Sequence, residues 1–368
     1  MNAVSPLEIF RAQGVPHRRV EDWKYSDLRS VIDAETFEHP YGVVMVVKTP
    51  SAQIETVIND ELPDWASSAV QSLGVGGAMD AAAKAFAPNI AAIRVPGGLQ
   101  IADPLHIEFH AEGQGQIILR LETGASLTLI ETHHADSEGL RNLSLSIILE
   151  DDAKLTHVRR EHFSKTSVTV ETMGVQVAKS AEYRAHFTSL GAKLSRTELS
   201  VLLAGEGADV DISSVSVLGD GAHSDVTTRI DHRMGHTQST QLFKAVAGGK
   251  SRAVYQGKIT VSEGADVSDS RQTAKGLLLG PRAEIDLKPE LEIFADDVKC
   301  AHGAAIGDLD VESLFYLRSR GIPEPEARTL LIRGFLEEAV EGIVREDIRA
   351  ETWQLIEQGL ARAMEPTP

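Results

Sequence analysis

The strongest constraint on the fold is a repeat of about 28 residues between positions 115 and 300. Each repeat begins with a small residue followed by alternating apolar positions, and successive starts lie 28, 28, 27 and 57 residues apart, the last being close to two steps. The starts are Ala125, Ala153, Ala181, Ala208 and Ala265, with residues 237–239 near the omitted step. A period of this length, built from strands without helices between them, predicts a solenoid whose turns bury one another's apolar faces.

The repeat predicts that the fold is mainly β, with a parallel β-helix flanked by helical regions. Parallel strands normally need helical crossovers, and a β-helix is the arrangement that avoids them. A last run begins at Ala283, only 18 residues after the previous one, and breaks the rhythm. The alternative fold is an antiparallel sandwich whose period is accidental.

Three regions are predicted: an N-terminal helical region (1–90), the β-helix core (91–303) and a C-terminal helical domain (304–368). The N-terminal region is expected to cap one end of the solenoid, with Trp23 and Tyr25 anchoring a loop on the core. The C-terminal domain is predicted to hold three helices, the first capped by Asp308 or Asp310. Their apolar faces either bind another protein or pack on one another and on the solenoid end.

Composition and charge exclude some classes of protein. The apolar fraction is 42%, and no apolar run approaches the roughly 20 residues that span a bilayer. The first six residues lack the basic and apolar segments of an export signal, and the single cysteine cannot form an internal disulfide, so a cytoplasmic location is expected. A net charge of -18 argues against nucleic-acid binding, which depends on Lys and Arg.

The most chemically distinctive segment is the one around Cys300, the only cysteine, with His302 two residues further on and glycines close by. It lies where the β-like repeats give way to helical sequence, so it is expected near the second end of the solenoid. The plain alternative is a buried, inert cysteine beside a hydrogen-bonded histidine.

Eight other histidines are scattered over different repeats. Two or three of them converging on one face would make a metal site, although solvated or hydrogen-bonded side chains are expected for most. They are His133, His134, His157, His162, His186, His223, His232 and His236.

The segment around Cys300 resembles a known family. The run 287–304, followed by 314–322, closely resembles the shared C-terminal signature of the SufB/SufD family, the scaffold subunits of the SUF iron–sulfur cluster assembly system. The resemblance is strong over about residues 225–342 and looser elsewhere, and residues 23–26 and the absence of further cysteines resemble the SufD branch. Further matches are Asp231-His232, residues 237–239, Phe243-Lys244 and residues 257–259.

The resemblance implies a right-handed parallel β-helix and two protein partners. A SufD-like chain pairs with SufB through the C-terminal end of the β-helix, with Cys300 and His302 as the iron or cluster site at that interface. The C-terminal helices bind one copy of the ABC-type ATPase SufC. The residues we select for that contact are Leu314, Phe315, Arg318, Arg320, Leu331 and Phe335.

The resemblance also implies a non-catalytic scaffold with a role in iron acquisition. No cofactor is expected on the chain alone; an iron–sulfur cluster or iron would be shared transiently with SufB, and reduced flavin is implied only for the complex, with no residues here assigned to it. Thiolate and imidazole are both iron ligands, but a cluster needs about four, so one Cys and one His require a partner. A homodimer is expected when the chain is alone.

The competing class is an enzyme built on a β-rich scaffold. A carbohydrate-active β-helix enzyme would place carboxylates along an outer groove. Such enzymes are usually exported, and the aromatic residues that stack on sugars make up only 5% of this chain. A cupin-like metal-binding enzyme is a further option, disfavoured because its paired-histidine spacing within one short strand run is absent.

Overall fold

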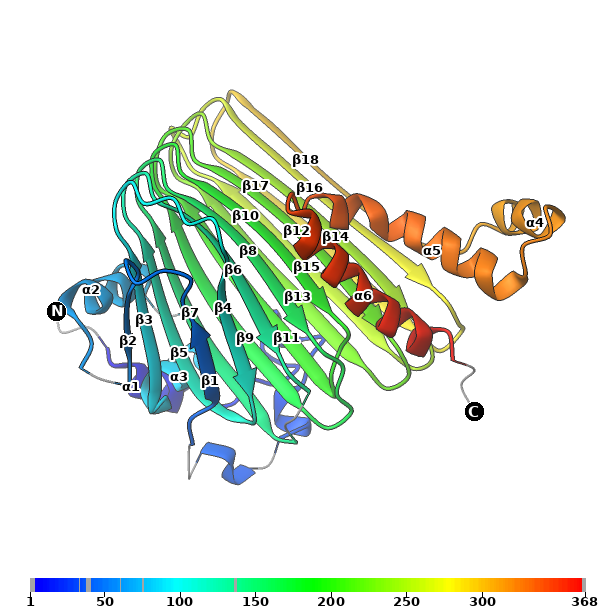
Figure 1. Cartoon of the computed structure of the whole chain (residues 1–368), viewed down its shortest axis with the longest axis horizontal. Coiled ribbons are helices and arrows are strands. Elements are labelled where there is room, and N and C mark those ends of the chain that lie inside the picture. Colours follow the sequence, from blue (N-terminus) through cyan, green and yellow to red (C-terminus); the bar gives the residue numbers. More distant parts are fainter. Residues whose placement is uncertain are drawn as a thin grey trace.

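A computed structural model describes residues 4–32, 34–37, 41–59, 61–74, 76–135 and 138–365. The chain forms a parallel β-solenoid of about eight turns, with helices at both ends of the sequence (Figure 1). Residues 1–3, part of the stretch from which the absence of an export signal was predicted, lie outside the described residues.

Two nine-stranded sheets make up the solenoid, and each full turn contributes one strand to each sheet. The first sheet has the order β1 (Val44–Lys48), β4 (Leu105–His110), β6 (Ser126–His133), β8 (Lys154–Glu161), β10 (Glu182–Ser189), β12 (Asp209–Leu218), β14 (Gln238–Ala247), β16 (Ser268–Leu278) and β18 (Val298–Asp308). The second has the order β17 (Glu284–Ile293), β15 (Arg252–Val261), β13 (His223–His232), β11 (Leu194–Leu203), β9 (Val168–Val177), β7 (Leu140–Leu149), β5 (Gly113–Leu121), β3 (Asn89–Val95) and β2 (Glu55–Ile58).

Neighbouring strands are parallel, apart from the pairs that β1 and β2 make with β4 and β3. The prediction of a parallel β-helix is therefore confirmed, and the antiparallel sandwich is wrong.

Strand register explains the repeat seen in the sequence. Leu127 pairs with Leu155 and Leu155 with Tyr183, so one repeat is one turn of the solenoid. The omitted step near residues 237–239 is β14, where Ser239 pairs with Val210. The run from Ala283 broke the rhythm because it leads into β17, which belongs to the other sheet.

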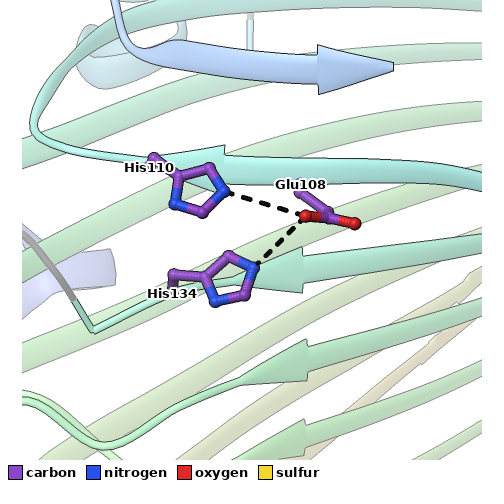
Figure 2. Close-up of side chains that lie close together, drawn as sticks. All are labelled: Glu108, His110 and His134. Carbon is purple, nitrogen blue, oxygen red and sulfur yellow. Dashed lines mark ion pairs between the residues drawn. The ribbon is translucent and has the colours of Figure 1, made fainter. Parts of the chain in front are cut away.

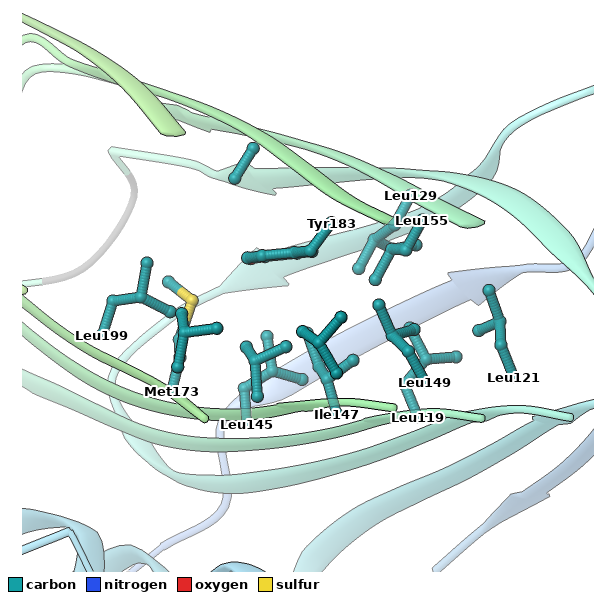
Figure 3. Close-up of a cluster of buried hydrophobic side chains, with 14 of the residues drawn as sticks. Leu119, Leu121, Leu129, Leu145, Ile147, Leu149, Leu155, Met173, Tyr183 and Leu199 are labelled. Atoms are coloured by element: carbon teal, nitrogen blue, oxygen red, sulfur yellow. The ribbon is translucent and has the colours of Figure 1, made fainter. Parts of the chain in front are cut away.

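The main core lies between the two sheets. Side chains at alternate positions of each strand point inward (Figure 3), so that Leu129, Leu155 and Tyr183 of the first sheet share one buried cluster with Ile147 and Leu149 of the second. Burying a side chain of this size contributes roughly 1.5–3 kcal/mol. The alternation of inward apolar and outward polar residues therefore fixes the register of each turn.

The N-terminal segment packs on the outside of the solenoid. It contains α1 (Pro6–Gln13), short 3₁₀ turns at Glu21–Trp23, Leu28–Ser30 and Ala34–Phe37, α2 (Asp64–Leu73) and α3 (Ala78–Phe86). The helices α2 and α3 contact β5, β7 and β9 on the outer face of the second sheet.

The N-terminal region was predicted to cap the solenoid end as a helical unit. It does close this end, but through the strands β1 and β2 and not through its helices. The region predicted as helical, 1–90, also supplies these two strands, since the run Val44–Val47 is continuously apolar and rich in β-branched residues.

The prediction that Trp23 anchors a loop on the core is confirmed. Trp23 is buried, and the Arg196 guanidinium lies over its ring at 4.2 Å from the centroid. Ser26 is buried nearby and donates a hydrogen bond to Asp225, 2.5 Å away. The loop is thereby fixed to β11 and β13.

Three C-terminal helices follow the last strand, as predicted: α4 (Val311–Ser319), α5 (Glu324–Glu341) and α6 (Glu346–Ala363). Asp310 caps α4 by accepting a hydrogen bond from the Glu312 amide. Helices α5 and α6 pack on the outer face of the first sheet, whereas α4 has no buried residue and projects away from the solenoid (Figure 1). The predicted boundary at 303/304 falls inside β18, which runs to Asp308.

None of the helices in the described part of the chain combines the length and the apolar character needed to cross a membrane.

Candidate functional site at the open end of the solenoid

The C-terminal end of the solenoid is open. The strands β17 and β18 form the last turn, and neither contains a buried residue. Large apolar side chains are exposed there, including Phe294 (63% exposed) and Ile306 (47%). Each strand is also the edge of its sheet, so one row of backbone donors and acceptors has no neighbour within the described chain. Such an edge is suited to pairing with a second chain.

Cys300 and His302 both lie on β18, at this edge. They pair in register with Ser270 and Gln272 of β16, which are buried and point into the solenoid. Because side chains two residues apart in a strand share a face, Cys300 and His302 are also on the inward side. No further turn covers them, so Cys300 is only half-buried and His302 is exposed. Their expected position at the second end of the solenoid is confirmed.

The environment of Cys300 favours the neutral thiol. Partial burial raises the pKa of the Cys300 thiol, the Asp269 carboxylate raises it further, and a hydrogen bond from the Ser270 backbone opposes both. The cysteine is free of any disulfide. A ligand that binds the thiolate must therefore displace a proton from it.

A column of hydrogen-bonded polar side chains lies directly behind Cys300. The hydroxyl oxygens of Ser270 and Ser239 are 2.6 Å apart, and Ser239 is 2.9 Å from His232 Nε2. The other ring nitrogen, Nδ1, is 2.7 Å from the Thr237 hydroxyl. Burial lowers the pKa of His232 to about 4, so its ring is neutral. Of these residues, His232, Thr237 and Ser239 were singled out in the sequence for their resemblance to the family, and the column supports the last turns from within.

A second polar cluster, not anticipated from the sequence, lies inside the closed part of the solenoid. Glu131 contacts His133 and accepts a hydrogen bond from His157, while Arg159 Nε donates to Glu171 Oε2 at 2.5 Å. All of these side chains are buried. The sequence held a signal for this cluster. Glu131 and His133 follow Leu127 and Leu129 at the inward alternate positions of β6, where apolar residues are expected, and Arg159 pairs with Glu131 one turn further on.

The charges in this cluster are strongly coupled. Burial, reinforced by the nearby Glu131 carboxylate, raises the pKa of Glu171 to about 7. Burial, the largest single effect, acts in the same direction on Glu131, but the hydrogen bond and charge of His157, the hydrogen bond with Glu171 and the charge of Arg159 together lower the pKa of Glu131. Burial lowers the pKa of His133 well below its ordinary value. The cluster therefore holds one ionised carboxylate and one that titrates near neutral pH, with Arg159 between them.

Most of the other histidines are hydrogen-bonded, as expected. His157 and His186 are buried inside the solenoid, and His186 lies 2.7 Å from the Ser213 hydroxyl. His223 contacts Ser26, and His236 is exposed near Glu206.

The residues selected for an ATPase contact lie on two different helices. Leu314, Phe315 and Arg318 are on the projecting helix α4 and Arg320 is its C-cap residue; Phe315 is 72% exposed. Leu331 and Phe335 are on α5, and both are half-buried. Phe335 is turned toward the solenoid, because the Lys244 ammonium lies 5.1 Å from its ring centroid. The six selected residues therefore form two groups: four at the projecting helix α4, and two on α5 nearer the solenoid.

The fold and the open end define a class of protein: a parallel β-solenoid that offers a cysteine and a histidine on its last strand. Residues 109–335 match the family model described as the SufBD core domain of SUF system FeS cluster assembly. The chain belongs to this family of iron–sulfur cluster assembly proteins.

Three relatives illustrate the similarity. The chain is 29% identical to the iron–sulfur cluster assembly protein SufD of Escherichia coli, over 94% of this chain and 90% of that protein. It is 31% identical to a SufBD family protein of Synechocystis, over 69% of this chain and 60% of the relative. It is also 31% identical to the chloroplastic protein ABCI7 of Arabidopsis thaliana, over 72% of this chain and 59% of the relative. The family places the chain with cluster assembly proteins rather than with carbohydrate-active or cupin-like enzymes.

Proposed function

We propose that this chain is a non-catalytic scaffold subunit that pairs through its open end with a second SufBD-family solenoid, a SufB-type chain. The observation that supports the proposal is the uncovered last turn, in which β17 and β18 have no buried residue. Exposed apolar side chains and two free strand edges at one end provide both the driving force and the geometry for end-to-end pairing. Without that partner, two copies of this chain would pair through the same surface.

In this proposal the nascent cluster, or the iron from which it is built, is cargo held at the paired ends. Cys300 and His302 point into the same space on β18 and would supply two ligands. A cluster needs about four, so the partner chain must supply the rest. The raised pKa of Cys300 keeps the thiol protonated until iron binds and displaces the proton. The role in iron acquisition follows from this half-site, and reduced flavin is proposed only for the assembled complex.

A second part of the proposal concerns helix α4 and an ATPase partner of the SufC type. The helix has no buried residue, and its apolar side chains Phe315 and Tyr316 are 72% and 56% exposed. Arg318 and Arg320 lie beside them and give the surface a positive margin. An exposed aromatic patch with arginines at its rim has the composition of protein–protein hot spots.

Co-expression with SufB and SufC homologues, followed by affinity purification, tests the scaffold role. A complex containing all three chains is expected, and recovery of this chain as a lone monomer would contradict it. Ile306→Lys should weaken pairing at least about tenfold, because it places a charge on the open face. Val44→Lys is the matched control: it alters an equally exposed side chain on β1, the edge strand of the other end, and should leave pairing unchanged.

The ligand role needs a separate measurement, made on the purified complex. His302→Ala should leave assembly intact, since His302 is exposed, and should lower the iron and cluster content. Cys300→Ser should do the same. If iron content is unchanged in the His302 variant, His302 is not a ligand, although the pairing proposal would stand.

A further inference from the structure

Three histidines form a stack on the outside of the solenoid, far from the open end. His110 ends β4, His134 follows β6 and His162 follows β8, so they come from successive turns of the first sheet. The rings of His110 and His134 are nearly parallel, with centroids 4.2 Å apart, and His162 continues the stack 5.6 Å from His134. One-to-one register between turns places these side chains above one another.

A carboxylate faces the edges of two of these rings. Glu108 lies two residues before His110 on β4, and its Oε2 atom is 3.8 Å from His110 Nε2 and 3.6 Å from His134 Nε2 (Figure 2). The other oxygen, Oε1, accepts a hydrogen bond from Lys48 on β1. That hydrogen bond lowers the pKa of Glu108, so the carboxylate is ionised at neutral pH. One anionic oxygen is thus held toward two imidazole nitrogens.

The group shows an unsatisfied buried atom. His134 Nε2 is shielded from solvent and has no hydrogen-bond partner among the described residues, although it points toward Glu108. Buried polar atoms are nearly always satisfied by protein, water or an ion. The three ligand atoms lie within 4.8 Å of one another. Tetrahedral ligands at bond lengths near 2.1 Å are roughly 3.4 Å apart, so small side-chain rotations would close the site.

A second group of similar composition can be set aside. Glu131, His133 and Glu171 also have ligand atoms within 4.8 Å of one another. The Arg159 guanidinium, however, already donates to Glu171, and all four side chains are enclosed by the solenoid. A fixed positive charge occupies the place that a cation would need. Among the described residues, the ion pair that Glu108 makes outside the two imidazoles is with Lys48, which binds the opposite carboxylate oxygen.

We propose that Glu108, His110 and His134 bind a divalent transition-metal ion. Two imidazole nitrogens and one carboxylate oxygen form a donor set suited to zinc, cobalt or ferrous iron and unsuited to magnesium or calcium. A fourth position remains for water or an added ligand. His162, stacked on the far side of His134, fixes the orientation of that ring. The site lies six to seven strand spacings from β18, roughly 29–34 Å at 4.8 Å per strand, and is independent of the function proposed above.

Titration of the full chain with Co²⁺ tests the site, in a Cys300→Ser background so that the accessible thiol does not contribute. One cobalt ion per chain is expected, with visible absorption bands of a four- or five-coordinate ion and a matching heat of binding. His110→Ala, His134→Ala and Glu108→Gln should each weaken binding at least about tenfold. Circular dichroism melting curves of each variant should match those of the parent.

Two further variants separate a metal site from a stack that is only structural. His236→Ala is the matched control, because His236 lies 3.9 Å from Glu206 but has no second imidazole in the same group. It should leave cobalt binding unchanged. Lys48→Met should tighten binding, because it frees Oε1 of Glu108 for the metal. Equal binding in the parent and the His134 variant, or equal losses in the His134 and His236 variants, would overturn the proposal.

Discussion

The two ends of the solenoid are both built from β-strands, but they differ in whether the inward-facing side chains are covered. At the N-terminal end, β1 and β2 run antiparallel to their neighbours, and Ile54 in the connection between them is buried against the core. The inward residues Leu105, Ile107 and Phe109 on β4 are at most 1% exposed. At the other end the equivalent inward positions of β18 are half-buried or exposed.

This difference shows that the parallel β-solenoid fold does not require an open end. The sequence at each end determines whether the core is covered there. Reversing the direction of a terminal strand interrupts the parallel stack, and the connection between β1 and β2 places a side chain over the core. The C-terminal end instead keeps the parallel direction to its last strand, and helices α5 and α6 pack on the side of the solenoid. The chain thus covers one end itself and leaves the last strands of the other end without a buried residue.

The largest effect expected from this comparison is on stability. Ile107→Ala at the closed end should lower the free energy of unfolding by about 2–5 kcal/mol, because it leaves a cavity in the core. Ile306→Ala, the same chemical change at the open end, should cost less than about 0.5 kcal/mol. Urea denaturation of the isolated chain measures both. Similar losses would mean that the open end is covered in solution.

An intermediate effect concerns the carboxylate enclosed in the closed part. The pKa of Glu171 is raised to about 7 from its ordinary value of 4.5, so the folded protein holds a proton that the unfolded chain releases across this interval. The resulting stabilisation is complete below about pH 4.5 and is lost as the pH rises through 7, at up to about 1.4 kcal/mol for each pH unit.

Glu171→Gln should remove this dependence, since the amide mimics the protonated acid. Stability relative to the parent should therefore rise between pH 5 and pH 8, as measured by denaturation at each pH. Both proteins retain Glu131 and His133, so the difference reports the titration of Glu171 together with its effect on these two coupled neighbours. Parallel pH profiles for the two proteins would show that Glu171 does not titrate in this range.

The smallest effect concerns the thiol at the open end. Cys300 should react with iodoacetamide in the native protein, but more slowly than an unhindered cysteine, because partial burial and Asp269 raise its pKa. Asp269→Asn should speed the reaction about two- to threefold. Asp211→Asn, a carboxylate on β12 of the same sheet, serves as the control and should have no effect. An unreactive Cys300 would show that the end is closed.

The sequence predicted the architecture well because the repeat reports directly on register. Each inward apolar position recurs after one turn, so the turns, the break at Ala283 and the location of Cys300 could all be placed before any coordinates. The cap at the other end could not be predicted, because the four apolar residues of Val44–Lys48 do not reveal the direction of the strand.

Polar clusters were harder to find than strands. His134 and His162 were noted in the sequence, but Glu108 and His110 were not connected with them, since the cluster depends on which residues of neighbouring turns stack on the outer face. Glu131 and Glu171 were missed because they come from opposite sheets. Pairing between sheets depends on the width and twist of the solenoid, and neither is encoded in the spacing of the repeat.

The one-to-one register of neighbouring strands makes the molecule extendable. Inserting a duplicate of one complete repeat, such as residues 154–181, adds one turn to the solenoid. The side chains that face inward on the other turns stay the same. Each added turn would increase the distance between Glu108 and Cys300 along the solenoid by about 4.8 Å. The distance between two chemical groups on the solenoid could thus be set by the number of turns inserted between them.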